Sequence, residues 1–207
     1  MTLLLISLTG YLFGCLHGSQ LVGFMKKINL KESGVKNAGA SNATIVLGWK
    51  YGVLVALIDI GKGMASVFLI RTLLTDSFTP DTLTALLFVN ALFVIIGHIF
   101  PLQMRFNGGK GTASIVGILL VLDWKIALIS ISLLLIVTFA TDYLVLGVLA
   151  MYASFFLLTI FFAYSTVPIT AVGVVWLISS IKHIENFKRL KNKEETRLSS
   201  LISKKAS

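Results

Sequence analysis

Long apolar runs separated by short polar segments make up most of the chain. Because a helix needs roughly 20 apolar residues to cross a ~30 Å hydrocarbon core, each run is a candidate membrane span. The runs lie at 1–25, 51–74, 82–104, 112–122, 126–140 and 143–181. The last is too long for one helix, and we divide it near 164–168, because Pro168 is well tolerated in a helix's first turn. The pattern predicts an all-α, polytopic integral membrane protein with about seven transmembrane helices.

Composition supports this class of protein. Hydrophobic residues make up 56% of the chain and charged residues 13%, whereas ordinary globular chains carry about 25% charged residues. The first run has no cationic start and no convincing cleavage site, so we expect a retained helix rather than a signal peptide. Cys15 is the only cysteine, which excludes an intramolecular disulfide.

The distribution of charge predicts the orientation. Seven crossings place most cations on one side of the membrane: Lys26, Lys27, Lys31, Lys36, Lys50, Arg105, Lys110, and the lysines and arginines of 182–205. The other side carries Asp76, Asp81 and Asp123, with Arg71 and Lys125 as its cations. The positive-inside rule then puts the N-terminus outside and the C-terminus in the cytoplasm. Topology accounts for the net charge of +9, so nucleic-acid binding is not expected. We expect one membrane domain, 1–207, ending in a basic cytoplasmic tail, 183–207.

A glycine-rich loop, Phe106 to Thr112, follows the third run. It lacks the spacing of a P-loop. Glycines at 108, 109 and 111 let backbone amides approach an anion, and a helix beginning near Thr112 adds its positive end. Lys110 supplies a full charge. An anion site and a flexible turn with an interfacial lysine remain open on spacing alone.

Asp59 and Lys62 lie three residues apart in the second run, so they share one helical face. Each intramembrane charge costs about 2.5–3.5 kcal/mol, and such residues normally face the bundle interior or a polar cavity. Mutual neutralisation is a sufficient structural reason for the pair. A functional role is the alternative.

The histidines differ in their surroundings. His98 precedes Pro101, which should end its helix and place the histidine near the glycine loop. His98 and His17 are each more typical of structural hydrogen-bonding groups than of catalysts. His183 and Asn186 share a face of a basic segment leaving the last run. A histidine there could orient or deprotonate a hydroxyl, since its unperturbed pKa is ~6.5; a snorkelling basic helix is the alternative.

The segment 31–42 is polar and rich in small residues. It suits a loop packed against a polar ligand, or a plain solvated connector.

Taken in order, these segments resemble the bacterial acyl-phosphate:glycerol-3-phosphate acyltransferases, the PlsY-type family. The family's GSIPxG is represented by Gly18 to Gly23, and its DxRxxGSGNxGATNxxR by Asn29 to Ile45. Its GHxFPxxxxFxGGKGVA is similar to 97–113, a specific match, and its HRxNxxRLxxGxE to His183 through Glu195. A DxxKG corresponds to Asp59, Lys62 and Gly63.

The resemblance implies roles for these residues. His183 and Asn186 would be catalytic. Substrate phosphate would be bound by Gly108, Gly109, Lys110, Gly111, Lys31, Lys36, Asn37 and Asn42. Supporting residues would be Ser19, Asp59, Lys62, His98, Arg189 and Glu195. No metal or other cofactor is implied.

Several family positions are substituted. The serine and glycine of GSGN fall on Val35 and Lys36, and the two arginines on Lys31 and Ile45. The stretch RYVSLxS falls on 142–148, where its arginine becomes Asp142 and its first serine Val145. The glycine before the final glutamate becomes Lys193. In the family that the chain resembles, the missing residues contribute to binding the substrates' phosphates. Valine has no hydroxyl and isoleucine no charge, so Val35 and Ile45 cannot make those contacts.

Three functions remain open at this stage. The first is transfer of an acyl group from acyl phosphate to the 1-hydroxyl of glycerol 3-phosphate, forming lysophosphatidic acid in the bacterial cell membrane. Its partners would be those substrates, membrane lipids and the enzyme that makes acyl phosphate. The second is a catalytically degenerate paralogue that binds or regulates. The third is a transporter of an anionic lipid precursor, against which stands the lack of a visible inverted repeat.

Overall fold

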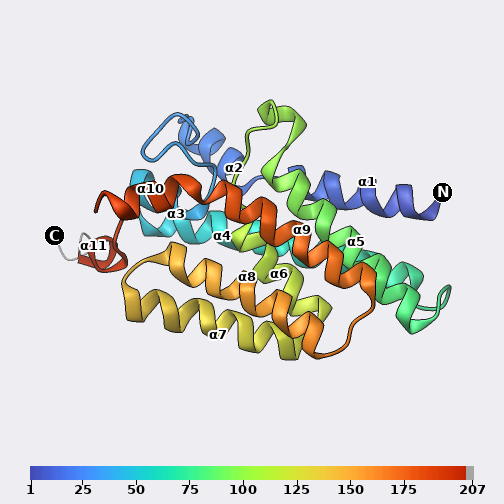
Figure 1. The fold of residues 1–207 in the computed structure, drawn as a ribbon. Helices are drawn as coiled ribbons and strands as arrows, with labels where there is room; N and C mark the ends of the chain where they lie inside the picture. The colour runs from blue at the N-terminus through green and yellow to red at the C-terminus, as the bar shows by residue number, and fades with distance from the viewer. Residues whose placement is uncertain (204–207) are drawn as a thin grey trace. The chain divides into compact units, whose positions relative to one another are not determined.

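The computed structural model describes residues 1–203, which form two compact units, Met1–Leu122 and the segment from Asp123 onward (Figure 1). All secondary structure in this range is helical, so the predicted all-α class is confirmed. The lysines at 204 and 205, part of the predicted basic tail, lie outside the described residues. The expectation of one domain, 1–207, stays a prediction.

In the first unit, the first predicted span is divided into two helices. Its helices are α1 (Thr2–Cys15), α2 (Gly18–Lys26), α3 (Ala40–Leu47), α4 (Trp49–Leu74), α5 (Pro80–Ile99), the 3-10 turn η1 (Leu102–Met104) and α6 (Thr112–Leu122). α1 packs along α5, and α4 packs against α6 and α3 (Figure 1). Pro80 occupies the first turn of α5, where proline is favoured. The helix ends before Pro101, as predicted.

Small residues let these helices approach closely. A Cβ on Gly14 of α1 would meet the Val94 carbonyl and Gly97 of α5, so both glycines belong to one tight crossing. Deeper in the unit, the Ser66 hydroxyl donates to Asn90 at 2.9 Å, and the Asn90 amide donates to the carbonyl of Ile6 at 3.1 Å. This buried polar pair links α4, α5 and α1.

The second unit contains α7 (Trp124–Thr141), α8 (Leu144–Phe161), α9 (Thr166–Lys182), α10 (Ile184–Lys191) and α11 (Leu198–Ser203). α7 and α8 form a hairpin, and α9 packs on α8 (Figure 1). Asp123 caps α7 through the amides of Lys125 and Ile126, and its other oxygen accepts from Tyr164 at 2.7 Å. The predicted break near 164–168 is confirmed, because α8 ends at Phe161 and α9 begins at Thr166.

Each predicted span has a counterpart among the helices. Within residues 1–203, five segments are long and apolar enough to cross a membrane: Thr2–Lys26, Trp49–Leu74, Pro80–Met104, Trp124–Thr141 and Leu144–Phe161. α9 and α10, bent by 44°, make a sixth if they are one span, and α6 is a shorter apolar helix. These correspond to the seven predicted runs. The number of crossings and their orientation stay predictions.

Candidate active site

The glycine loop is closed onto the end of α5. The Gly108 amide donates to the carbonyl of Ile99 at 3.0 Å, and the Gly109 amide to that of His98 at 3.1 Å. A Cβ on Gly108 would overlap the His98 carbonyl and the Pro101 ring, so the close approach requires glycine. The predicted placement of His98 beside the loop is therefore confirmed.

The end of the loop nearest α6 is the part suited to an anion. The amides of Gly108 and Gly109 are engaged with α5, so their direct binding of phosphate stays a prediction. Gly111, at φ 83°, turns the chain into α6, and the Ile115 amide donates to its carbonyl at 2.9 Å. The amides that precede Ile115 are those that a helix N-terminus leaves for an anion. Lys110 is half-buried beside them.

Asn42 holds the polar loop between α2 and α3 in shape. Its side-chain nitrogen donates to the carbonyls of Leu30 at 2.7 Å, Ser33 at 3.0 Å and Asn37 at 2.9 Å. Its oxygen accepts from the Val35 amide at 2.9 Å. These contacts occupy the Asn42 side chain, so we assign it to loop shape. Direct phosphate binding by Asn42 or Asn37 stays a prediction.

Lys36 and Lys193 are two of the three lysines in the described part of the chain that occupy left-handed backbone positions, the third being Lys27. Lys36 has φ 53° and Lys193 has φ 61°, a region that glycine adopts without strain and other residues rarely enter. Both are positions at which the resemblance has glycine. The backbone thus keeps the shape that glycine permits while the side chain adds a charge.

A cavity of about 420 Å³ lies in the first unit beside α2. Ligand pockets are commonly ~300–1,000 Å³, so its size suits a small amphiphile. Its lining is part polar and part apolar, and includes Ser19, Lys27, Asn29, Lys31, Phe24 and Met104. The Lys31 ammonium also reaches the Gly108 carbonyl at 3.4 Å, which joins the cavity to the glycine loop. Ser19 is buried, and its hydroxyl has no hydrogen-bond partner in the described structure.

Asp59 and Lys62 form an ion pair at 3.3 Å, as their spacing predicts, and both are buried. Lys62 also lies 2.7 Å from Nδ1 of His98, whose ring stacks on His17 with centroids 4.6 Å apart. His17, Asp59 and His98 each offer one metal-ligand atom, all within 4.8 Å of one another. The Lys62 ammonium already occupies this group, so a metal ion would have to displace a cation of the chain itself.

His183 stands at the bend between α9 and α10 in the second unit, and it is buried. Its Nδ1 lies 2.8 Å from the carbonyl of Ser179. A carbonyl only accepts, so Nδ1 carries the proton and the neutral ring has its lone pair on Nε2. That tautomer is the one that a general base or a hydroxyl acceptor needs.

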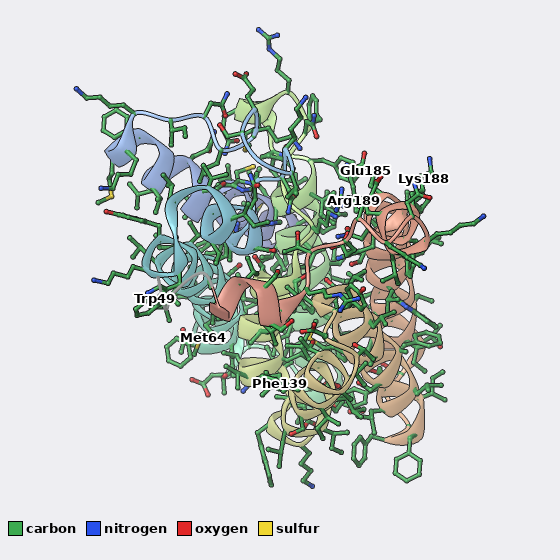
Figure 2. The ribbon with its side chains drawn as sticks, turned by 90° about the vertical axis from the view of Figure 1, so that its left-hand side faces the viewer. Trp49, Met64, Phe139, Glu185, Lys188 and Arg189 are labelled. Atoms are coloured by element: carbon green, nitrogen blue, oxygen red, sulfur yellow. The ribbon has the colours of Figure 1, made fainter. Side chains whose placement is uncertain are left out.

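Glu195 binds two of the polar side chains of α10, Asn186 and Arg189. Its Oε1 accepts from the Asn186 amide at 2.8 Å, and its Oε2 accepts from Nε of Arg189 at 2.8 Å. Figure 2 shows Arg189 grouped with Glu185 and Lys188 on α10. The left-handed turn at Lys193 directs the chain back so that Glu195 reaches α10.

Asp142 was not expected to make specific contacts. It has φ 66° between α7 and α8, and its carboxylate accepts from the Ser199 amide at 2.8 Å and hydroxyl at 2.6 Å. Its carbonyl accepts from the Leu198 amide at 2.9 Å. These hydrogen bonds hold the pKa of Asp142 below its usual value. Asp142 stands where the family that the chain resembles has a phosphate-binding arginine. In this protein it binds the first residues of α11 instead.

The remaining substituted positions have simple surroundings. Val145 is buried in the first turn of α8, and Ile45 is half-buried on α3. His17, which we interpreted as a structural residue, is buried beside Asp59 and His98. Its position just after an apolar helix is the only signal in the sequence that would have indicated this.

Apolar helices run through both units; the first also holds a glycine loop at a helix N-terminus beside an amphiphilic cavity, and the second holds a buried histidine. These features fit a membrane-embedded transferase. The chain belongs to the glycerol-3-phosphate acyltransferase family, whose model matches residues 4–193. The predicted enzyme class is thereby confirmed: the protein is an acyltransferase of lipid biosynthesis and a multi-pass protein of the bacterial cell membrane.

Individual relatives agree along nearly the whole chain. Glycerol-3-phosphate acyltransferase 1 of Oceanobacillus iheyensis is 55% identical over 202 residues, 97% of each chain. The Thermotoga petrophila glycerol-3-phosphate acyltransferase is 33% identical over 196 residues, covering 94% of this chain and 95% of its own. Crystal structures of PlsY, an integral membrane glycerol 3-phosphate acyltransferase, are also similar. The glycerol 3-phosphate form has a TM-score of 0.88 at 28% identity over 98% of both chains, and the lysophosphatidic acid form 0.83 over 95%.

Proposed function

We propose that this enzyme transfers an acyl group from an acyl phosphate to the 1-hydroxyl of glycerol 3-phosphate, forming lysophosphatidic acid and inorganic phosphate. The solved relatives are named for glycerol 3-phosphate and lysophosphatidic acid, which supports the acceptor and the product. The observation that carries the proposal is the position of Lys31. It lines the amphiphilic cavity and contacts the glycine loop, so one cation serves both an acyl-bearing and a phosphate-bearing region.

The bond changes are those of acyl transfer. The 1-hydroxyl oxygen attacks the acyl carbonyl carbon, and the bond from that carbon to the phosphate oxygen breaks. Lys110, Lys31 and the amides at the start of α6 stabilise the departing phosphate, since hydrogen bonds to a charged acceptor are the strong ones. Acyl phosphate is already activated and neither bond change is a redox step, so we propose that no cofactor takes part.

His183 receives or orients the hydroxyl proton. Its Nε2 lone pair suits both roles, and a phosphate oxygen of the donor is the alternative proton acceptor. Asn186, fixed by Glu195, positions the acceptor substrate beside it. We place this chemistry at the cytoplasmic leaflet, where acyl phosphate made by a separate enzyme arrives, and we include direct association with that enzyme in the proposal.

The test is an assay of the detergent-solubilised protein with acyl phosphate and labelled glycerol 3-phosphate. We expect equimolar lysophosphatidate and inorganic phosphate. Product formed only with acyl-CoA would contradict the donor. Binding of both substrates without product would favour the degenerate paralogue, and flux of a lipid precursor in liposomes without product would favour the transporter. Cysteine labelling beside Asn107 from the cytoplasm and beside Asp76 from outside checks the orientation.

A further inference from the structure

The chain breaks between α1 and α2 inside the first candidate span, and this break needs polar partners. Residues 16 and 17 are not helical, so backbone groups on either side of them lose their intrahelical bonds. Such groups are tolerated at membrane depth only where protein satisfies them. Lys62 of α4 donates to the carbonyls of Gly14 at 2.8 Å and Leu16 at 2.5 Å. Asp59 accepts from the Gly18 amide at 3.2 Å.

Each charge faces the helix end that it suits. The ammonium lies at the C-terminal end of α1, where the helix dipole is negative, and the carboxylate lies at the N-terminal end of α2, where it is positive. Two side chains one turn apart on α4 therefore hold both ends of the break. Mutual neutralisation would explain their pairing but not these backbone contacts.

The same ammonium also reaches the glycine loop through His98. Lysine has three N–H donors, and two serve the α1 and α2 break. The third is directed to Nδ1 of His98, 2.7 Å away, and the Asp59 carboxylate, at the longer distance of 3.3 Å, shares these donors. With Nδ1 accepting, the neutral ring carries its proton on Nε2, the atom that a Cβ on Gly109 would overlap. The His17 ring stacks on the His98 ring. The backbone carbonyl of His98 also accepts from the Gly109 amide.

We propose that Asp59 and Lys62 are positioning residues: they fix the His98 ring, and through it the glycine loop, in the geometry that binds substrate phosphate. The inference rests on the proposed phosphate-binding function of the loop. None of the contacts involves the reacting atoms, so Asp59, Lys62 and His98 act through the loop and are not catalytic.

The test compares Lys62→Met with a matched control. Lys62→Met keeps the length of the side chain and removes all three donors. Asn90→Leu, the control, breaks the buried Ser66–Asn90 pair elsewhere on the same helices and leaves the loop untouched. Hydrogen exchange of the 108–112 amides and the KM for acyl phosphate, whose phosphate the loop is proposed to bind, are measured for both, with thermal unfolding to match their stability losses. A misplacement of about 1 Å can cost ~100-fold, so we expect at least a tenfold rise in KM and faster loop exchange in Lys62→Met alone.

A second variant separates the loop from the helix break. In His98→Asn the amide oxygen still accepts from Lys62, so the break remains held, but the ring against Gly109 is lost. We expect faster loop exchange with little loss of thermal stability, and this variant decides the question if Lys62→Met does not fold.

The outcomes distinguish this inference from the proposed function. Loop exchange and KM unchanged in both variants, or changed equally in Asn90→Leu, would overturn the positioning role. A wild-type protein without acyltransferase activity would remove the proposed function, while the exchange measurement would still decide whether the pair positions the loop.

Discussion

The side-chain amide of Asn186 donates to Oε1 of Glu195 at 2.8 Å, across nine residues and a change of chain direction. The other carboxylate oxygen accepts from Arg189, so Glu195 is held from two sides. An asparagine held in this way presents its remaining polar atoms in a fixed orientation, and this ordering is what proximity effects in catalysis require.

Replacing Glu195 by alanine should therefore lower kcat more than it raises KM. The lost bond is of the kind worth about 1.5–3 kcal/mol, which corresponds to roughly 10–100-fold. Glu195→Gln, which still accepts from Asn186 but carries no charge for Arg189, should lose less. Steady-state kinetics measure both, with exposed Glu194→Ala as the control. Equal losses in the Gln and Ala variants would show that charge rather than orientation matters.

His183 offers a test of where the hydroxyl proton goes. Its Nδ1–H is held by the Ser179 carbonyl, so Nε2 is the ring nitrogen with the lone pair that a base uses. Glutamine places an oxygen near the Nε2 position and can accept a hydrogen bond, but it cannot take up a proton.

If His183 is the base, His183→Gln should lower kcat by about 10²–10⁴-fold with folding retained by thermal unfolding. Retention of more than a tenth of the wild-type kcat would instead assign the proton to a phosphate oxygen and leave His183 an orienting role. The pH profile of kcat gives a second reading, since loss of a histidine base removes the limb that its titration contributes.

Lys36 and Lys193 provide a matched pair, because both have left-handed backbone but only Lys36 lies in the predicted phosphate-binding loop. Glycine at either position removes strain of about 1–2 kcal/mol, partly offset by the greater entropy of glycine in the unfolded chain, ~0.4–1 kcal/mol. Each Lys→Gly variant should gain between about 0 and ~1.6 kcal/mol in unfolding free energy.

Their activities should differ. Lys36→Gly is expected to raise the KM for a phosphate substrate because its charge is lost, whereas Lys193→Gly should leave the kinetics unchanged. A rise in KM of the same size in both would mean that the lysines act through general electrostatic attraction. No change in Lys36→Gly would remove it from the site.

We expect the contact between Asp142 and the start of α11 to depend on pH. The pKa of Asp142 in the folded protein is below the unfolded value of about 3.9, so the ionised form is the one that binds Ser199. The sign follows: the contribution is fully present above about pH 4 and is lost as the pH falls through the depressed folded pKa. Protection of the Leu198 and Ser199 amides, measured against their intrinsic exchange rates at each pH, should fall below that pH. Asp142→Asn should give fast exchange at all pH values, and an unchanged acid dependence in that variant would contradict the assignment.

The parts of this structure that follow from local chemistry could be predicted from the sequence. Pro101 follows the end of α5 because proline cannot continue a helix, and Pro168 lies in the first turn of α9, where its missing N–H is tolerated. Asp59 and Lys62 pair because a helix brings residues three apart together. The Asp142–Ser199 contact spans 57 residues and carries no periodic signal. The hydrogen bonds from the Gly108 and Gly109 amides to carbonyls of α5 were not predicted either. The glycines indicate a close backbone approach but not which group approaches.

The substituted phosphate contacts lead to the last prediction. Val35 and Ile45 lack the hydroxyl and the charge found at these family positions, while the Val35 amide still bonds to Asn42, so the loop keeps its shape. The site is therefore expected to keep its shape but to have fewer hydrogen-bond donors. The wild-type KM for glycerol 3-phosphate should accordingly be high. Each lost bond to a charged group is worth ~1.5–3 kcal/mol, or about tenfold per 1.4 kcal/mol.

Restoring both residues in Val35→Ser with Ile45→Arg should lower that KM by at least about tenfold. The two are changed together because contacts to one ligand are not additive. Val35→Ala with Ile45→Gln is the control, since it alters size and polarity without supplying a hydroxyl or a charge. High wild-type affinity that disappears in Lys36→Ala would show that Lys36 already compensates. A restored variant without improvement would place the deficit in the 142–148 stretch, where Asp142 and Val145 stand at positions that the family fills with arginine and serine.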